Sequence, residues 1–253
     1  MTARRFTTVL AATVFVEAII VAFLSGPALA ATTTCPAPGS TVRGGLVVSG
    51  GCTTSDVTIN GGVTITGGGR LTIYASTVNG GVTVEPNGEF DANFPTRTGG
   101  ANTIHGGITM TKPLDLDLSG GTVDGAFVID GNTPRAGFFF IYSICGATLN
   151  GNLTIKNLPA FPNGIGAGDP GETDLTPCAP NTIHGSVFIQ DSPSSRIELE
   201  ANTISGSVFV DNSHASLSGN TISGSLMCTN GGTLVKYDTD DTNTNTVGGQ
   251  NGC

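Results

Sequence analysis

Two aspartates in the stretch LDLDL, Asp115 and Asp117, are the residues whose spacing most directly suggests chemistry. Residues two apart in a β-strand lie on the same face, so their carboxyl groups would be neighbours. Paired carboxylates are what retaining and inverting glycosidases use. The same alternation is also ordinary for a half-exposed strand, and we favour this non-catalytic interpretation.

A second candidate site combines His105 with Asp124. Each occupies the third place of a repeated four-residue phrase, so we expect them to stack roughly 5 Å apart. A histidine oriented by a carboxylate can act as a general base. No nucleophile accompanies the pair, and the scarcity of Lys and Arg argues against a polysaccharide lyase, although Lys112 is close to Asp115 in sequence. We therefore favour a solvated polar face here as well.

The acidic stretch YDTDDTNTN at residues 237–245 is a weak candidate for a metal site. Asp238, Asp240 and Asp241 supply oxygen ligands of the kind that Ca²⁺ prefers, but the Gly and Glu of an EF-hand loop are missing. The chain has no C-x-x-C pair and its three histidines are scattered, so zinc is not expected. We expect no cofactor, with Ca²⁺ in this stretch as the alternative.

The first thirty residues have the pattern of a signal peptide. A basic start at Arg4 and Arg5 precedes an apolar run over residues 6–24 and the small-x-small sequence ALA at 28–30. Glu17 within the apolar run is unusual, and an uncleaved anchor is the alternative. No later stretch is apolar for long enough to span a membrane.

Charge and cysteine content limit the classes of partner. Residues 31–253 contain 8 Lys and Arg against 18 Asp and Glu. Such an acidic chain has no general attraction for nucleic acid or anionic lipid. All six cysteines follow the export signal, and an even number there predicts disulfides formed in an oxidising compartment. We therefore expect a secreted or cell-surface protein.

One phrase, Thr-[Ile/Val/Leu]-x-Gly, occurs ten times after the signal. Most copies are followed by a second short strand pattern, such as VTI at 63–65, and many by a third, such as RLTI at 70–73. Alternation points the aliphatic residue inward and the threonine and x outward. One such unit cannot bury its apolar side chains alone, so stacking of the copies is required. The copies are at 41–44, 58–61, 77–80, 103–106, 122–125, 148–151, 182–185, 203–206, 221–224 and 246–249.

This repeat resembles that of the right-handed parallel β-helix proteins over nearly all of residues 31–253. The resemblance implies an all-β fold, a single-stranded parallel β-helix (β-solenoid) of about ten coils. The Pro- and Gly-rich stretch 157–180 is expected to be an inserted loop. Polysaccharide-processing enzymes and adhesins both occur in this fold class. The resemblance also implies an asparagine ladder from the residue before the repeat threonine, at Asn102, Asn181, Asn202, Asn220 and Asn245.

The cysteines lie at the two ends of the repeat array and beside the long loop. Open sheet edges at the ends of a solenoid invite pairing with other chains. Bonds between cysteines that are neighbours in sequence would pin these ends. We therefore expect the disulfides Cys35–Cys52, Cys145–Cys178 and Cys228–Cys253.

Two outward files of side chains are candidate contact surfaces. The repeat threonines form one file, and a second begins with Thr64, Thr83, Thr109 and Thr154 and continues as Phe188, Phe209 and Met227. Flat threonine arrays resemble those of ice-binding solenoids, but the second file breaks and a glycine corner should separate the files. The apolar end of the second file would suit a partner, a sugar or a second copy. The alternative is that the 157–180 loop covers it.

The sequence thus favours an exported, non-catalytic β-solenoid with a structural or adhesive role at the cell surface or outside the cell. Its expected partner is an extracellular polysaccharide or a surface protein, and its oligomeric state is left open. One alternative is a polysaccharide lyase or glycoside hydrolase that uses Asp115, Asp117, Asp124 and His105. A further alternative is ice binding through the threonine files.

Overall fold

A computed structural model of the chain describes residues 33–92, 101–133, 142–159, 164–168, 178–237 and 241–253. These residues form 28 short strands, and the paired strands run parallel. Among them there is no helix with the length and hydropathy needed to cross a membrane. The predicted all-β fold is confirmed. The predicted signal peptide, residues 1–30, lies outside the described residues.

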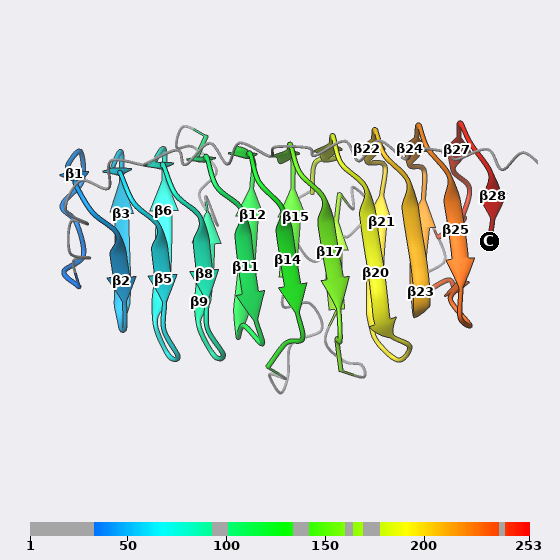
Figure 1. The fold of residues 1–253 in the computed structure, drawn as a ribbon, viewed down its shortest axis with the longest axis horizontal. Helices are drawn as coiled ribbons and strands as arrows, with labels where there is room; N and C mark the ends of the chain where they lie inside the picture. The colour runs from blue at the N-terminus through cyan, green and yellow to red at the C-terminus, as the bar shows by residue number, and fades with distance from the viewer. Residues whose placement is uncertain (1–32, 93–100, 134–141, 160–163, 169–177, 238–240) are drawn as a thin grey trace, which may run out of the picture.

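The chain visits three faces in turn, and each face runs along the whole rod (Figure 1). The first face consists of β1 (Thr41–Val42), β4 (Thr58–Ile59), β7 (Thr77–Val78), β10 (Thr103–Ile104), β13 (Thr122–Val123), β16 (Thr148–Leu149), β19 (Thr182–Ile183), β22 (Thr203–Ile204), β24 (Thr221–Ile222) and β27 (Thr246–Val247). The second face consists of β2 (Leu46–Val48), β5 (Val63–Ile65), β8 (Val82–Val84), β11 (Ile108–Thr111), β14 (Phe127–Asp130), β17 (Leu153–Lys156), β20 (Val187–Ser192), the first half of β23 (Val208–Ser218), β25 (Leu226–Thr229) and β28 (Asn251–Gly252). The third face consists of β3 (Gly51–Ser55), β6 (Arg70–Tyr74), β9 (Glu89–Ala92), β12 (Asp115–Ser119), β15 (Tyr142–Cys145), β18 (Gly164–Ala167), β21 (Arg196–Glu200), the second half of β23 and β26 (Thr233–Leu234).

Successive coils stack in register. Each repeat threonine pairs with the threonine of the next coil, from Thr41 with Thr58 to Thr221 with Thr246. The predicted column of aliphatic residues is therefore present on the first face; its members from Ile59 to Ile222 are at most 1% exposed, and Val42 and Val247 at its two ends are partly buried. This column includes Ile104, Val123, Leu149, Ile183, Ile204 and Ile222. The parallel β-helix of ten stacked repeats is confirmed.

The interior of the coil is filled from all three faces. On the third face, one inward column runs through Leu71, Phe90, Leu116, Tyr142, Ile165 and Ile197. These side chains join those of the other two faces in one hydrophobic core. Full burial of such a side chain contributes about 1.5–3 kcal/mol. Stacking thus supplies the burial that no single coil could achieve.

The glycine that ends the repeated phrase is required by close stacking. We expected it to permit a sharp corner, but the copies from Gly61 to Gly249 do not have left-handed backbone angles. A Cβ added at Gly125 would instead lie 2.4 Å from the backbone nitrogen of Gly107 in the preceding coil. Positive φ occurs two residues before the repeat threonine, at Gly39, Asp56, Ala75, Gly120, Gly146, Ala201 and Gly219.

Asparagine side chains form a ladder at the turn into the first face. Each Nδ2 donates to the Oδ1 of the next asparagine at 2.9–3.1 Å. The same oxygens accept backbone N–H groups of the preceding coil. The ladder contains Asn181, Asn202, Asn220 and Asn245. Asn102 is separate from this ladder, because it bonds to the backbone of Ser76 and Ile73.

Serine side chains form similar ladders at the other two turns. At the turn into the second face, Ser186 Oγ accepts the backbone N–H of Ser207, and Ser207 Oγ accepts that of Ser225. At the turn out of the second face, Ser213 Oγ accepts the N–H of Ser192. Buried backbone donors need partners, and these side chains supply them where the backbone changes direction.

All six cysteines are paired, and the bonds join neighbouring coils. The expected end pairings, Cys35–Cys52 and Cys228–Cys253, are confirmed, and Cys145–Cys178 lies between them along the rod. The Cα–Cα separations of 4.8–5.3 Å lie within the usual disulfide range. Each bond is worth about 3 kcal/mol in the chain-entropy description.

The stretch 157–180, expected to be an inserted loop, contributes a strand of the third face. β18 pairs with β15 on one side and β21 on the other. Its inward residues Ile165 and Ala167 are fully buried. Without this strand the inward column of the third face would be interrupted in this coil. Residues 160–163 and 169–177 lie outside the described residues.

Replacement of Gly125 by alanine tests the close stacking of the coils. The new Cβ would lie 2.4 Å from backbone atoms that cannot move without shifting a coil. Overpacking costs about 1–3 kcal/mol, so we expect the free energy of unfolding to fall by about 2 kcal/mol in urea titrations followed by circular dichroism. Gly51→Ala is the control, because no heavy atom lies within 4 Å of the added Cβ, and it should change stability by less than about 0.5 kcal/mol. Equal losses in the two variants would contradict the close-stacking explanation.

Replacement of Asn202 by alanine tests the asparagine ladder. It would leave the N–H of Asn181 and the carbonyl of Ala167 without partners in a fully buried position. Each buried orphan costs about 1–3 kcal/mol, so we expect the free energy of unfolding to fall by about 2–4 kcal/mol. Asn245→Ala, at the partly exposed end of the ladder, should cost under about 1 kcal/mol because water can replace the amide. Similar losses at both positions would argue against a ladder that stabilises the buried turn.

Candidate functional site

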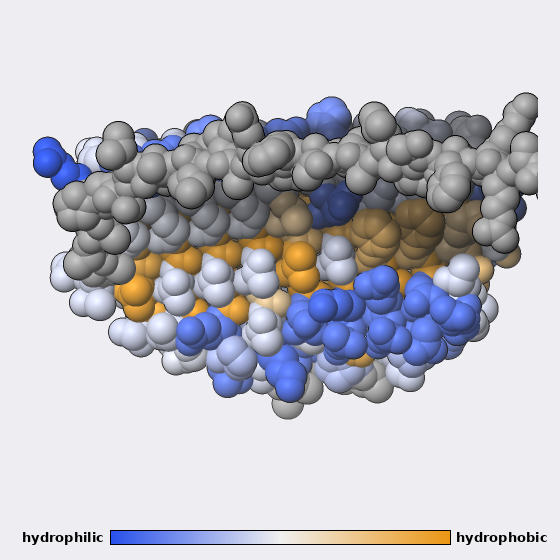
Figure 2. All heavy atoms as spheres, viewed as in Figure 1, coloured by the Kyte–Doolittle hydropathy of each residue, from blue (hydrophilic) through white to orange (hydrophobic). Residues whose placement is uncertain are grey.

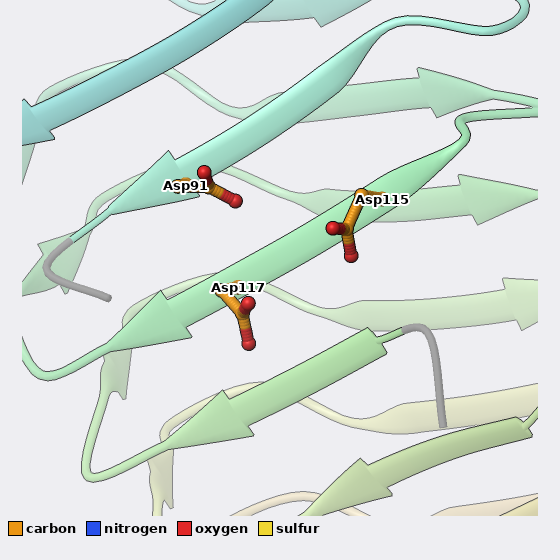
Figure 3. Close-up of side chains that lie close together, drawn as sticks. All are labelled: Asp91, Asp115 and Asp117. Carbon is orange, nitrogen blue, oxygen red and sulfur yellow. The ribbon is translucent and has the colours of Figure 1, made fainter. Parts of the chain in front are cut away.

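Three carboxylates meet on the outer side of the third face. Asp91 on β9 is in register with Asp117 on β12, and Asp115 lies two residues earlier on β12. One oxygen from each side chain lies within 4.8 Å of the others. Figure 3 shows the three side chains gathered along β9 and β12. Asp115 and Asp117 thus share one strand face, as alternation predicts, and a third carboxylate joins them.

Asp91 is the most buried member of this acidic cluster, with 1% of its surface exposed. Its Oδ2 accepts hydrogen bonds from Arg70 Nε at 3.0 Å, Arg70 Nη2 at 2.7 Å and Thr72 Oγ1 at 3.1 Å. Both donor residues are on β6, the strand on the far side of β9 from β12. Asp91 Oδ1 is buried and has no hydrogen-bond partner in the described structure.

Arg70 is shared between two carboxylates. Its Nη2 lies 2.7 Å from Asp91, and its Nε lies 3.5 Å from Glu89. The hydrogen bonds that Arg70 donates to Asp91 are the main reason that the pKa of Arg70 is raised, and the negative charges of Asp91, Glu89 and Asp115 add to this rise. The guanidinium therefore stays charged and compensates part of the negative charge on the β6 side of Asp91.

Asp115 and Asp117 are both half-buried and hydrogen-bonded. Asp115 Oδ1 accepts the backbone N–H of Leu116 at 2.9 Å, and Asp117 Oδ1 accepts the hydroxyl of Ser143. Both groups carry the oxygen ligands that a hard cation such as Ca²⁺ prefers.

His105 and Asp124 are in contact at the rim of the first face, one coil apart. His105 Nδ1 lies 2.7 Å from Asp124 Oδ2, and Asn150 Nδ2 donates to Asp124 Oδ1 at 2.7 Å. These hydrogen bonds, from Asn150 first and His105 second, lower the pKa of Asp124. Asn60 and Asn79 make the same kind of contact in earlier coils, at 2.8 Å. The pair is therefore one part of a polar file that bonds from coil to coil.

The four residues considered for catalysis fall into two groups. His105 and Asp124 directly follow strands of the first face, whereas Asp115 and Asp117 are on β12 of the third face. A single catalytic centre built from all four is not formed. Each pair would have to act alone.

The apolar stripe Phe188, Phe209 and Met227 occupies one outward file of the second face. The three residues are in register on β20, β23 and β25, and all are partly exposed. The rings of Phe188 and Phe209 stack with centroids 5.2 Å apart and planes 7° apart. Figure 2 shows hydrophobic surface over these strands, bordered by a hydrophilic area along the same face. Most of the 157–180 stretch, the alternative cover for this stripe, lies outside the described residues.

The strand register identifies the other members of the outward file to which the stripe belongs. From the N-terminal end it contains Val47, Thr64, Thr83, Thr109, Val128 and Thr154, followed by the stripe. Val47 begins the file and Val128 interrupts the threonines, and neither was recognised from the repeat. The repeat threonines lie on the first face and this file on the second, so the two do not form one flat array of the kind expected for ice binding.

Asp241 has an internal role near the C-terminus. It is 2% exposed, and its carboxylate accepts hydrogen bonds from the hydroxyl of Ser216 and the backbone N–H of Tyr237. These bonds tie the end of the chain to β23. Asp238 and Asp240, the other two candidate Ca²⁺ ligands, lie outside the described residues, so calcium in this stretch stays a prediction.

Comparison with known proteins gives no relative: no family model, no curated protein and no solved structure matches the chain. The structure itself identifies a disulfide-bonded parallel β-helix. This fold and these disulfide bonds suggest an extracellular protein.

Proposed function

We propose that the protein is an exported, non-catalytic adhesive β-solenoid that binds a neutral extracellular polysaccharide along its second face. The observation that carries this proposal is the partly exposed stripe of Phe188, Phe209 and Met227, continuous with a file of threonines. Aromatic and apolar side chains gathered on an exposed surface typically mark a contact site.

The form of the second face suits an extended chain molecule. Its outward side chains repeat once per coil, at the strand spacing of about 4.8 Å. Threonine hydroxyls supply both hydrogen-bond donors and acceptors, and the stripe supplies apolar contact. A polysaccharide presents hydroxyl groups and C–H surfaces in alternation along its length, so it can use both features.

The charge of the protein favours a neutral ligand. Acidic residues exceed basic ones by 19 to 10 over the whole chain. An acidic polysaccharide or an anionic surface would therefore be repelled at long range. Neutral glycans carry no such penalty.

The placement of the acidic cluster supports a binding role over a catalytic one, and the carboxylate beside the stripe, Asp211, accepts hydrogen bonds from Thr229 and Asn230. The acidic cluster is on the third face, whereas the stripe is on the second. A glycan held along the stripe on the second face would not reach the acidic cluster on the third face. Glycoside hydrolysis needs an acid and a base on either side of the bound glycosidic bond.

The test replaces Phe188 and Phe209 together by threonine, the residue found at most other places of the file. This change removes the stacked rings but keeps the strand preference and the register. Loss of two aromatic contacts should weaken binding by about 10- to 100-fold. Binding is measured by depletion onto insoluble neutral polysaccharides (cellulose, chitin and starch) and by calorimetry with soluble oligosaccharides of the one retained.

Val128→Thr is the matched control, because it makes an apolar-to-threonine change in the same file outside the stripe. It should leave binding unchanged, and thermal unfolding should show that both proteins are folded. The proposal fails if no neutral polysaccharide retains the unmodified protein, or if the control loses as much affinity as the double variant. Cleavage of any polysaccharide in the panel would show that the protein is an enzyme.

A further inference from the structure

We propose that Asp91, Asp115 and Asp117 form a binding site for one Ca²⁺ ion on the third face. This site is separate from the polysaccharide-binding face and from the acidic stretch 237–245. The three side chains come from adjacent strands of a rigid sheet, so the stacked coils hold them together without a ligand. One carboxylate oxygen from each residue lies within 4.8 Å of the other two.

A second observation that supports a bound cation, besides the spacing of the three side chains, is the unpartnered oxygen of Asp91. This residue is 1% exposed, yet its Oδ1 has no hydrogen-bond partner in the described structure. A buried carboxylate oxygen without a partner is strongly unfavourable and calls for an explanation, such as a bound ion.

The orphan oxygen is directed into the cluster. Arg70 and Thr72 hold Oδ2 from β6, on the side of β9 away from Asp115 and Asp117. Figure 3 shows one oxygen of Asp91 pointing toward β12, the strand that carries the other two aspartates. Arg70 thus donates its hydrogen bonds to Oδ2. A cation between β9 and β12 would be coordinated by Oδ1.

The oxygen spacing favours calcium over magnesium. Ca²⁺ takes six to eight oxygen ligands at about 2.3–2.6 Å, so oxygens on opposite sides of the ion are about 5 Å apart. Mg²⁺ requires about 2.0–2.1 Å and near-ideal octahedral geometry, which limits that distance to about 4 Å. Three oxygens spread over as much as 4.8 Å match the larger ion. Water can complete its shell.

The test titrates CaCl₂ into the full-length, oxidised and EDTA-treated protein by isothermal titration calorimetry. We expect one ion per chain with a dissociation constant of about 10⁻⁴–10⁻³ M, the range of extracellular calcium modules. At tenfold excess over that constant, Ca²⁺ should raise the Tm by about 3–6 °C. Mg²⁺ should bind at least tenfold more weakly.

Asp115→Asn and Asp117→Asn should each weaken Ca²⁺ binding by tenfold or more. Asparagine keeps an oxygen that accepts the same hydrogen bond from Leu116 or Ser143, so both variants should fold. Two variants are used so that misfolding of one, detected by circular dichroism, still leaves a measurement.

Asp211→Asn is the matched control on the second face, where this aspartate accepts hydrogen bonds from Thr229 and Asn230. It should bind Ca²⁺ as the unmodified protein does, and so should the double variant Asp238→Asn/Asp240→Asn. The proposal is overturned if the unmodified protein shows no saturable binding up to about 10 mM Ca²⁺. It is also overturned if only the 238/240 variant loses binding, or if Mg²⁺ binds as tightly as Ca²⁺.

Discussion

The structure depends on the close approach of successive coils at the glycine that ends each repeated phrase. An added Cβ at Gly61, Gly106 or Gly125 would lie 2.4–2.7 Å from the backbone of the preceding coil. This approach fixes the register of the first face, and through the connecting turns it fixes the register of the other two. Inward side chains then fall on one another and form a continuous core, which no single coil could bury. Outward residues are left free to vary, because alternation separates them from the core.

The chemistry of the turns changes along the rod. In the N-terminal coils the residue after the repeat glycine is also glycine, as at Gly62, Gly81 and Gly107. In the C-terminal coils this place is taken by serines that accept backbone N–H groups, and the asparagine ladder runs alongside. The same coils carry Phe188 and Phe209 on the second face. The C-terminal half thus has turns tied by side chains beneath its apolar surface, and the Cys228–Cys253 bond closes its end.

Much of the fold could be predicted from the sequence, because the repeat fixes spacing and face together. The aligned threonines and the buried isoleucines follow from ten copies of one phrase, and the end disulfides follow from the positions of the cysteines at the two ends of the array. β18 was not predicted, because GIGA has little of the β-branched pattern of a strand and lies among prolines and glycines. The acidic cluster was only half predicted. Asp91 is 26 residues before Asp117, and the variable length of these coils hides the alignment until Phe90 is paired with Leu116. The role of the repeat glycines could not be predicted from the sequence. A glycine required by a short distance between two backbones gives the same sequence pattern as a glycine required by a sharp turn.

A solenoid of this kind separates stability from function more completely than most globular folds. The inward and turn residues of each coil serve the stacking, whether the turn carries glycine or serine, so these positions carry no information about a ligand. Specific function must then reside in outward residues that depart from the prevailing Thr, Asn and Ser. In the described structure the clearest departures are the stripe on the second face and the acidic cluster on the third. They lie on different faces, so a ligand at one surface does not contact the residues of the other. The two surfaces are therefore expected to bind independently, each through a contact spacing set by the same stacked coils.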